Sequence, residues 1–97
     1  MFTIIGRRWF EKTNGNTYHS VEVYKDGELL GRIPFAYGYG DQYKQTALDL
    51  LVKLGHYPNT EAKHGGYECY RQFTFSKQSG GDGNFFSVSD VARKKDL

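Results

Sequence analysis

The sequence predicts an α+β domain in which one helix packs on one face of an antiparallel sheet. Three observations predict it: two turn signals between alternating segments, one amphipathic helical stripe after them, and a second alternating region near the carboxyl end. The chain of 97 residues has the size of one domain, so residues 1–97 are expected to share one core. The expected order of elements is β-β-β-α-β-β.

The amino-terminal third predicts a three-stranded antiparallel meander. Residues 2–12 are rich in β-branched and aromatic types, and the turn cluster at residues 14–16 follows them. Residues 17–25 alternate between apolar and polar types, and a two-residue hairpin signal, Asp26-Gly27, comes next. Residues 28–37 then supply the third strand.

The second strand has two distinct faces. Its alternation places His19, Val21 and Val23 on one face. The opposite face carries Tyr18, Ser20, Glu22 and Tyr24. In the third strand Pro34 cannot donate to a hydrogen-bond ladder, so that strand is expected to be an edge or to be bulged there.

Residues 42–54 predict the helix. Asp41 is a natural N-cap, Gly55 stands where a helix-ending glycine belongs, and Pro58 prevents the helix from resuming. The polar residues 55–66 predict a loop. The apolar stripe that the helix is expected to bury against the meander consists of Tyr43, Ala47, Leu50, Leu51 and Leu54.

The carboxyl-terminal part predicts two more strands. Residues 67–76 alternate and indicate a fourth strand, and the glycine-rich residues 79–84 would join it in a hairpin to a returning strand at 85–88. The tail, residues 89–97, fits either a short helix or a continuation of that strand to Val91. We favour the strand.

The composition argues against several classes of protein. A net charge of +2 gives no strong field for nucleic acid or for an anionic membrane. No apolar run approaches the roughly 18 residues of a membrane span, and no leader pattern opens the chain. The single Cys69 excludes an intramolecular disulfide framework and is expected to be a small buried hydrophobe in a reducing cytoplasm.

A glycine-rich turn is the first candidate site. It leads from the third strand to the helix amino terminus, where free backbone N–H groups and the helix dipole favour an anion. Its glycines allow close approach of a ligand, and its tyrosines offer stacking faces and hydroxyl groups. Asp41, as the N-cap, would compete for the anion position, and a plain strand-to-helix turn is the alternative. The candidate residues are Tyr37, Gly38, Tyr39, Gly40 and Tyr43.

The second candidate site is Arg7-Arg8-Trp9-Phe10 on the first strand. Arg7 and Trp9 share one face, and an arginine beside a tryptophan suits a ligand that combines a phosphate and a base. The alternative is a face on which the arginine stems simply cover aromatic rings. Other cations that the sequence alone does not place are Arg32, Lys44 and Arg71.

Catalytic and metal sites are not expected. His56, His64 and Cys69 do not have zinc-site spacing. His19 and Ser20 are adjacent in a strand and therefore point to opposite faces, so they cannot form a nucleophile–base pair. The sequence therefore predicts a protein that is not an enzyme and that needs no cofactor or metal.

Three strings resemble a family of short uncharacterised proteins of tailed bacteriophages and prophages. They are RRWFEKTNGNTYHSVEVY (7–24), FAYGYGDQY (35–43) and VSDVARKKDL (88–97). The resemblance covers most of the chain and implies a phage-encoded protein that acts in the host cytoplasm. By analogy with small phage accessory proteins, it suggests inhibition of host defences or regulation of host machinery.

A partial likeness to the double-stranded-RNA-binding domain is carried by SVEVYKDGELLG (20–31) and QYKQTALDLLVKLG (42–55). The chain departs from that domain because it has no amino-terminal helix and has one lysine, Lys44, in place of a basic run at the helix start. The phosphate contacts that dominate such binding would therefore be missing.

These observations lead to one expected function with two alternatives. The expectation is a small non-enzymatic module that binds a nucleotide or nucleotide-like anion through the two candidate sites. The alternatives are a protein-binding inhibitor of a host factor and, less favoured, a nucleic-acid-binding module. No membrane partner is expected, and a homo-oligomer is left open.

Overall fold

The computed structural model describes residues 1–58 and 66–97, and it confirms the predicted α+β class with one main helix on a sheet. Part of the predicted loop over 55–66 lies outside the described residues. Short 3₁₀ turns occur at Lys77–Ser79 and Lys94–Asp96. The main elements are β1 (Phe2–Glu11), β2 (Asn16–Lys25), β3 (Glu28–Tyr37), α1 (Gln42–Lys53), α2 (Gly66–Thr74) and β4 (Phe85–Val91).

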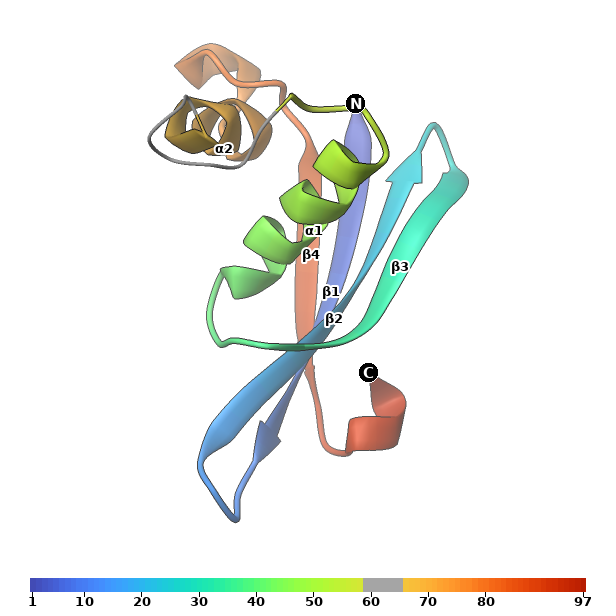
Figure 1. Ribbon diagram of the computed structural model, residues 1–97, viewed down its shortest axis with the longest axis vertical. Helices are drawn as coiled ribbons and strands as arrows, with labels where there is room; N and C mark the ends of the chain where they lie inside the picture. Colours follow the sequence, from blue (N-terminus) through green and yellow to red (C-terminus); the bar gives the residue numbers. More distant parts are fainter. Residues whose placement is uncertain (59–65) are drawn as a thin grey trace.

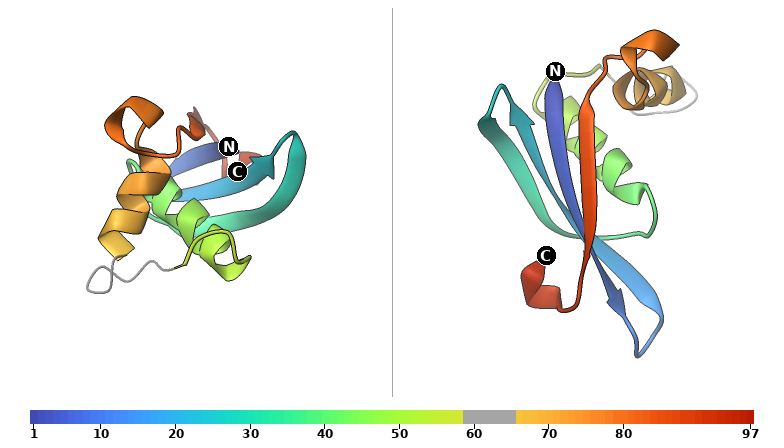
Figure 2. Two further views of the ribbon diagram at one scale, coloured as in Figure 1. Left: turned by 90° about the horizontal axis from the view of Figure 1, so that it is seen from above. Right: turned by 180° about the vertical axis from the view of Figure 1, so that it is seen from behind.

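The four strands form a mixed sheet in the order β3-β2-β1-β4 (Figure 1). The strands β1, β2 and β3 are the predicted antiparallel meander, and β4 pairs with β1 in parallel. The helix α1 crosses one face of the sheet, and α2 lies near it at the end where β4 begins (Figure 2). The β1–β2 hairpin extends well beyond α1 (Figure 1).

The prediction of a strand over 67–76 was wrong, because most of this segment is the helix α2. Its alternating pattern also contains a helical one: Cys69 and Phe73 lie four residues apart and are both buried. Burial of both side chains in the core favours the helix over the strand. The predicted hairpin to 85–88 was wrong for the same reason, since β4 has no strand at 67–76 to pair with and lies beside β1 instead.

The other strand predictions were confirmed. The strand after the glycine-rich segment continues to Val91, as favoured, before the Lys94–Asp96 turn. Pro34 lies on the edge strand β3, and the pairing of β2 with β3 shifts between His19 and Val21, opposite the segment that contains Pro34. The proline therefore lies where a missing donor costs little.

The helix α1 buries much of the predicted stripe, with three changes: Leu48 is buried as well, Leu50 is half-buried and Leu54 is exposed. Tyr43, Ala47 and Leu51 are buried, whereas Leu54 is 44% exposed. Gly55 has a φ of 88° and ends the helix as expected. Asp41 is the N-cap residue, as predicted, but its side chain makes no capping hydrogen bond. Its carboxylate lies 3.9 Å from the Lys44 ammonium instead.

The core forms where α1 meets the sheet. Close approach of the two depends on Gly6, because a Cβ at that position would lie 2.6 Å from the ring of Tyr43. The glycine in β1 therefore makes room for the first turn of α1. The buried side chains of the core include Ile4, Val21, Val23, Tyr43, Ala47, Leu48, Leu51, Tyr57, Cys69 and Phe73.

We expect Gly6→Ala to lower the free energy of unfolding by about 1–3 kcal/mol, since the buried Tyr43 ring must move to admit a methyl group. Urea unfolding of both proteins measures the change. Gly31→Ala is the control, because its Cβ would meet the end of the Leu50 side chain at 3.2 Å and that side chain can adjust. Equal losses for the two variants would contradict this account of the α1–β1 contact.

Candidate functional site

The turn from Tyr37 to Asp41 joins the edge strand β3 to α1. Gly38 N–H donates to the carbonyl oxygen of Thr17 at 2.9 Å, which holds the turn against β2. Gly38 has a φ of 143°, and a Cβ there would lie 2.2 Å from the Gln42 side chain. Gly40 has a φ of 61°. Both positions therefore favour glycine for conformational reasons.

A buried histidine fastens this turn to both β2 and α1. His19 is fully buried, its Nδ1 lies 3.1 Å from the Gly38 carbonyl oxygen, and its Nε2 lies 2.6 Å from Thr46 Oγ1. A carbonyl oxygen can only accept, so Nδ1 carries the proton. The single Thr46 hydroxyl proton has two acceptors within reach, and the 2.6 Å contact to Nε2 is much shorter than the 3.3 Å contact to the Gln42 carbonyl oxygen, so we assign this proton to the bond with Nε2. We call His19, Gly38 and Thr46 the His19 latch.

The latch requires a neutral imidazole. Burial lowers the pKa of His19 below its ordinary value of 6.5, and the hydrogen bond to Gly38 opposes part of that shift. At neutral pH the ring is therefore uncharged. A neutral ring with one donor and one acceptor satisfies both of its partners, and the turn is held without a buried charge.

Tyrosines surround a hollow beside the turn. Tyr39 is 78% exposed and Tyr37 is 66% exposed, although both belong to a segment that the latch holds in place. The hollow has a volume of about 660 Å³. We call it the tyrosine hollow, and its lining residues are Tyr37, Gly38, Tyr39, Asp41, Gln42, Gln45 and Tyr70.

A second hollow, of about 400 Å³, adjoins the first at Tyr39 and contains Arg8. The guanidinium of Arg8 donates through Nη1 to the Gly40 carbonyl oxygen at 3.1 Å and through Nε to Asp90 Oδ1 at 2.8 Å. The Asp90 side chain is 75% exposed. We call this the arginine hollow, and its lining residues are Arg8, Phe10, Thr17, Tyr39, Gly40, Asp90 and Val91.

The structure brings part of the two predicted sites together. Arg8 reaches the glycine turn, so Arg8, Gly40 and Tyr39 form one surface. Arg7 and Trp9 alternate with Arg8 along β1 and lie on the opposite face of the sheet. Tyr37 and Gly38 line the tyrosine hollow. Tyr43 is 3% exposed, so its ring belongs to the core and offers no surface to a ligand.

The predicted turn segment contained Gln42, whereas four other polar residues of the two hollows were missed: Thr17, Gln45, Tyr70 and Asp90. Gln42 and Gln45 lie three apart on the first turn of α1, and this spacing places both near the turn, so the sequence held a signal for Gln45. Tyr70 and Asp90 come from α2 and β4. The sequence had no signal for these two, because their positions follow from the helix α2 and the parallel pairing of β4.

Within residues 1–58 and 66–97, no three His, Cys, Asp or Glu side chains gather in a way that could hold a metal ion. The same part of the chain contains no helix long and apolar enough to cross a membrane. The described chemistry of the two hollows is therefore that of tyrosine hydroxyls, amides, one guanidinium and two exposed carboxylates.

Comparison with known proteins finds no matching family model, no matching curated protein and no matching solved structure.

We expect acid to weaken the fold through His19. Its folded-state pKa is lowered, so its contribution to stability is fully present above pH 6.5 and is lost as the pH falls toward the folded-state pKa. In that window the free energy of unfolding should fall by up to about 1.4 kcal/mol per pH unit. Urea unfolding at several pH values between about 7.5 and 5 measures the slope.

The matched variants are His19→Gln and His56→Gln, since the His56 side chain is exposed. His19→Gln should be less stable at neutral pH and should lose the histidine-dependent part of the slope, whereas His56→Gln should retain it. A slope that His19→Gln leaves unchanged would show that this imidazole does not titrate as the latch requires.

Proposed function

We propose that this protein is a non-enzymatic binding module for a nucleotide or nucleotide-like anion, with its site in the two adjoining hollows on either side of Tyr39. The observation that supports this most is the hydrogen bond from Arg8 to Gly40, which joins a guanidinium to a tyrosine-rich turn. We also propose the setting that the resemblance to tailed-phage proteins implies, namely a counter-defence role in the host cytoplasm.

The tyrosine hollow suits an aromatic base. Its volume of about 660 Å³ falls within the range of about 300–1,000 Å³ typical of small-molecule sites. Tyr37 and Tyr39 offer exposed rings for stacking, while Gln42 and Gln45 offer amide groups that can both donate to and accept from the edge of a base. The latch holds Tyr39 in place before a ligand arrives, which lowers the entropy cost of binding.

The arginine hollow suits the phosphate. Arg8 already makes one hydrogen bond to the turn, so its guanidinium is oriented, and its remaining donors can meet phosphate oxygens. The Asp90 carboxylate accepts a hydrogen bond from Nε of this guanidinium. The Asp90 side chain is 75% exposed, and an exposed ion pair contributes little to stability. A phosphate can therefore replace Asp90 as the partner of Arg8.

A protein partner is the second candidate, and one observation favours it. Phe10, Tyr37 and Tyr39 are 53%, 66% and 78% exposed, and all three line the two hollows. Exposed aromatic side chains on a braced turn are typical of binding hot spots. In this case the same surface would bind a host protein as an inhibitor. A pull-down from host lysate with the Tyr39→Ala variant as control tests it.

We expect a nucleotide that binds in the hollows to raise the melting temperature of the protein. Arg8→Ala should weaken the binding by about tenfold or more, because it removes charged hydrogen bonds to phosphate. Asp90→Asn should strengthen it by roughly two- to fivefold, because it removes a competing anion worth the energy of a surface ion pair. Thermal shift with a panel of linear and cyclic nucleotides, followed by calorimetry of any hit, measures these effects.

The control is Lys53→Ala, which removes an exposed positive charge at the far end of α1. Tyr39→Ala should reduce binding while the melting temperature of the free protein stays nearly unchanged, since this ring is largely exposed. A panel in which no nucleotide shifts the melting temperature would rule out the nucleotide and leave the protein partner. Arg8→Ala and Lys53→Ala with equal effects would also contradict the proposed site.

A further inference from the structure

The face of the sheet opposite α1, which we call the open face, carries a row of stacked rings. Trp9 of β1 stacks on Tyr18 of β2 with ring centroids 5.8 Å apart and planes inclined by 26°. Tyr18 stacks on Phe35 of β3 at 4.7 Å and 19°. Each ring stacks on a ring of the neighbouring strand, so the row runs across the strands from Trp9 to Phe35. The face of Phe35 that points away from Tyr18 is the end of the row. Phe35 is 43% exposed.

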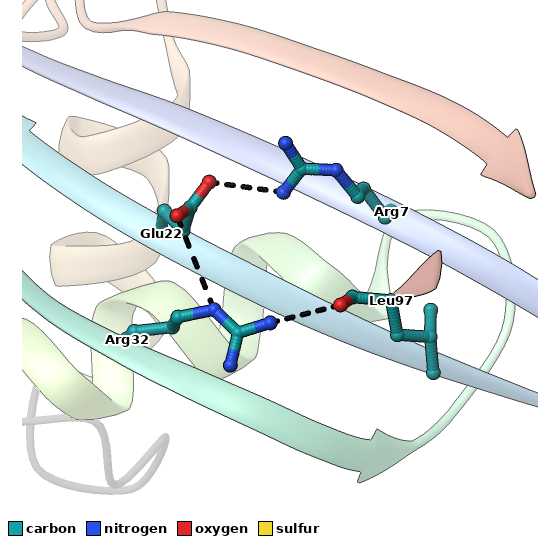
Figure 3. Close-up of polar contacts among 4 residues, drawn as sticks. All are labelled: Arg7, Glu22, Arg32 and Leu97. Atoms are coloured by element: carbon teal, nitrogen blue, oxygen red, sulfur yellow. Dashed lines mark hydrogen bonds and ion pairs between the residues drawn. The ribbon is translucent and has the colours of Figure 1, made fainter. Parts of the chain in front are cut away.

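Charged side chains lie along the middle of the same face. Glu22 Oε1 accepts from Arg7 Nη1 at 2.9 Å, and Glu22 Oε2 lies 3.9 Å from Arg32 Nε (Figure 3). The two guanidinium side chains are each about one-third exposed, while that of Glu22 is 19% exposed. One side-chain carboxylate thus faces two guanidinium groups.

The segment that follows β4, residues 92–97, lies over this face and reaches β3. Lys94 Nζ lies 4.9 Å from the centroid of the Phe35 ring, at the end of the aromatic row. Arg32 Nη2 donates to the backbone oxygen of Leu97 at 2.9 Å (Figure 3). The Lys94 ammonium therefore covers the outer face of the Phe35 ring, and the backbone oxygen of Leu97 accepts from the Arg32 guanidinium. These are the positions that a stacked base and a phosphate oxygen would take.

We propose that the open face binds single-stranded nucleic acid, with one base stacked on Phe35 and with phosphates held by Arg7, Arg32 and Lys94. Lys94 leaves the Phe35 ring as the base enters and then pairs with a phosphate. The segment 92–97 thus exchanges its contact with Phe35 for one with the nucleic acid. An unpaired strand fits this face because it presents a free base face and a phosphate at every nucleotide, whereas a duplex hides the faces of its bases.

This site is distinct from the two hollows and does not rest on the proposed function. The hollows lie on the α1 side of the sheet around Arg8, whereas the aromatic row lies on the other side. Tyr37 connects the two regions, because its ring meets that of Tyr18 edge to face at 5.7 Å and also lines the tyrosine hollow. A strand that leaves the aromatic row at β3 therefore passes the hollow at its Tyr37 edge.

The test titrates the full chain against fluorescein-labelled oligothymidylate and oligouridylate of about 15 nucleotides, near the upper end of known site sizes. Anisotropy measures affinity, and the fluorescence of Trp9, the one tryptophan in the sequence, reports on the open face directly. We expect binding that quenches Trp9. With three phosphate contacts, the logarithm of the affinity should fall against the logarithm of the salt concentration with a slope of about −2.

Phe35→Leu should weaken binding by about tenfold, because it removes the stacking face and keeps an apolar side chain. Phe75→Leu is the matched control, since Phe75 is 39% exposed and follows α2, away from this face, and its affinity should equal that of the unchanged protein. Lys94→Glu is a second variant at a surface position and should also weaken binding, whereas Lys53→Glu, with the same change in net charge, should not.

Arg8→Ala separates the two proposals, because it should leave oligonucleotide affinity unchanged while it weakens the binding of a mononucleotide by about tenfold or more. An oligonucleotide that leaves the anisotropy unchanged at low salt would overturn the open-face proposal. So would binding that leaves Trp9 fluorescence unchanged, or equal losses for Phe35→Leu and Phe75→Leu. None of these outcomes affects the nucleotide site around Arg8.

Discussion

The His19 latch is the contact on which the functional surface depends. A fully buried imidazole joins three segments, because its own strand β2, the Gly38 carbonyl and the Thr46 hydroxyl belong to different parts of the chain. Buried polar groups are costly when they lack partners, so this ring stabilises one arrangement of the turn and penalises the others. The backbone hydrogen bond from Gly38 to Thr17 acts in the same direction. Together they hold the turn that carries the exposed Tyr39.

The two faces of the sheet differ because α1 packs on only one of them. On the α1 side, the first turn of the helix must lie close to β1, and Gly6 makes room for Tyr43 there. That placement brings the turn within reach of Arg8 and forms the two hollows. On the other side no α-helix covers the strands among the residues that the structure describes. The segment 92–97 contacts this face through Lys94, over the Phe35 ring, and through the Leu97 backbone oxygen, which accepts from Arg32 (Figure 3). One strand, β1, thus supplies Arg8 to one surface and Arg7 to the other.

The sequence was informative where structure is decided locally. The hairpin signal at Asp26-Gly27, the stripe of α1 and the glycine at its end depend on neighbours a few residues apart, and they were confirmed. The segment that forms α2 failed because Cys69 and Phe73 fit either an alternating or a helical pattern, and only packing on the core decides between them. The link from Arg8 to Gly40 joins residues 32 apart, and Asp90 reaches Arg8 through a parallel strand pair. Neither contact leaves a pattern in the sequence, which explains why the sequence could suggest a shared site but not which residues of the two clusters meet.

The protonation state of His19 tests this account most directly. Long-range ¹H–¹⁵N correlation spectra of the imidazole at neutral pH distinguish the two neutral tautomers from each other and from the charged ring. The latch predicts a neutral ring with its proton on Nδ1 and a bare Nε2 that accepts from Thr46. A proton on Nε2 alone, or a charged imidazole at neutral pH, would contradict the latch and with it the reason that the turn holds Tyr39 in place.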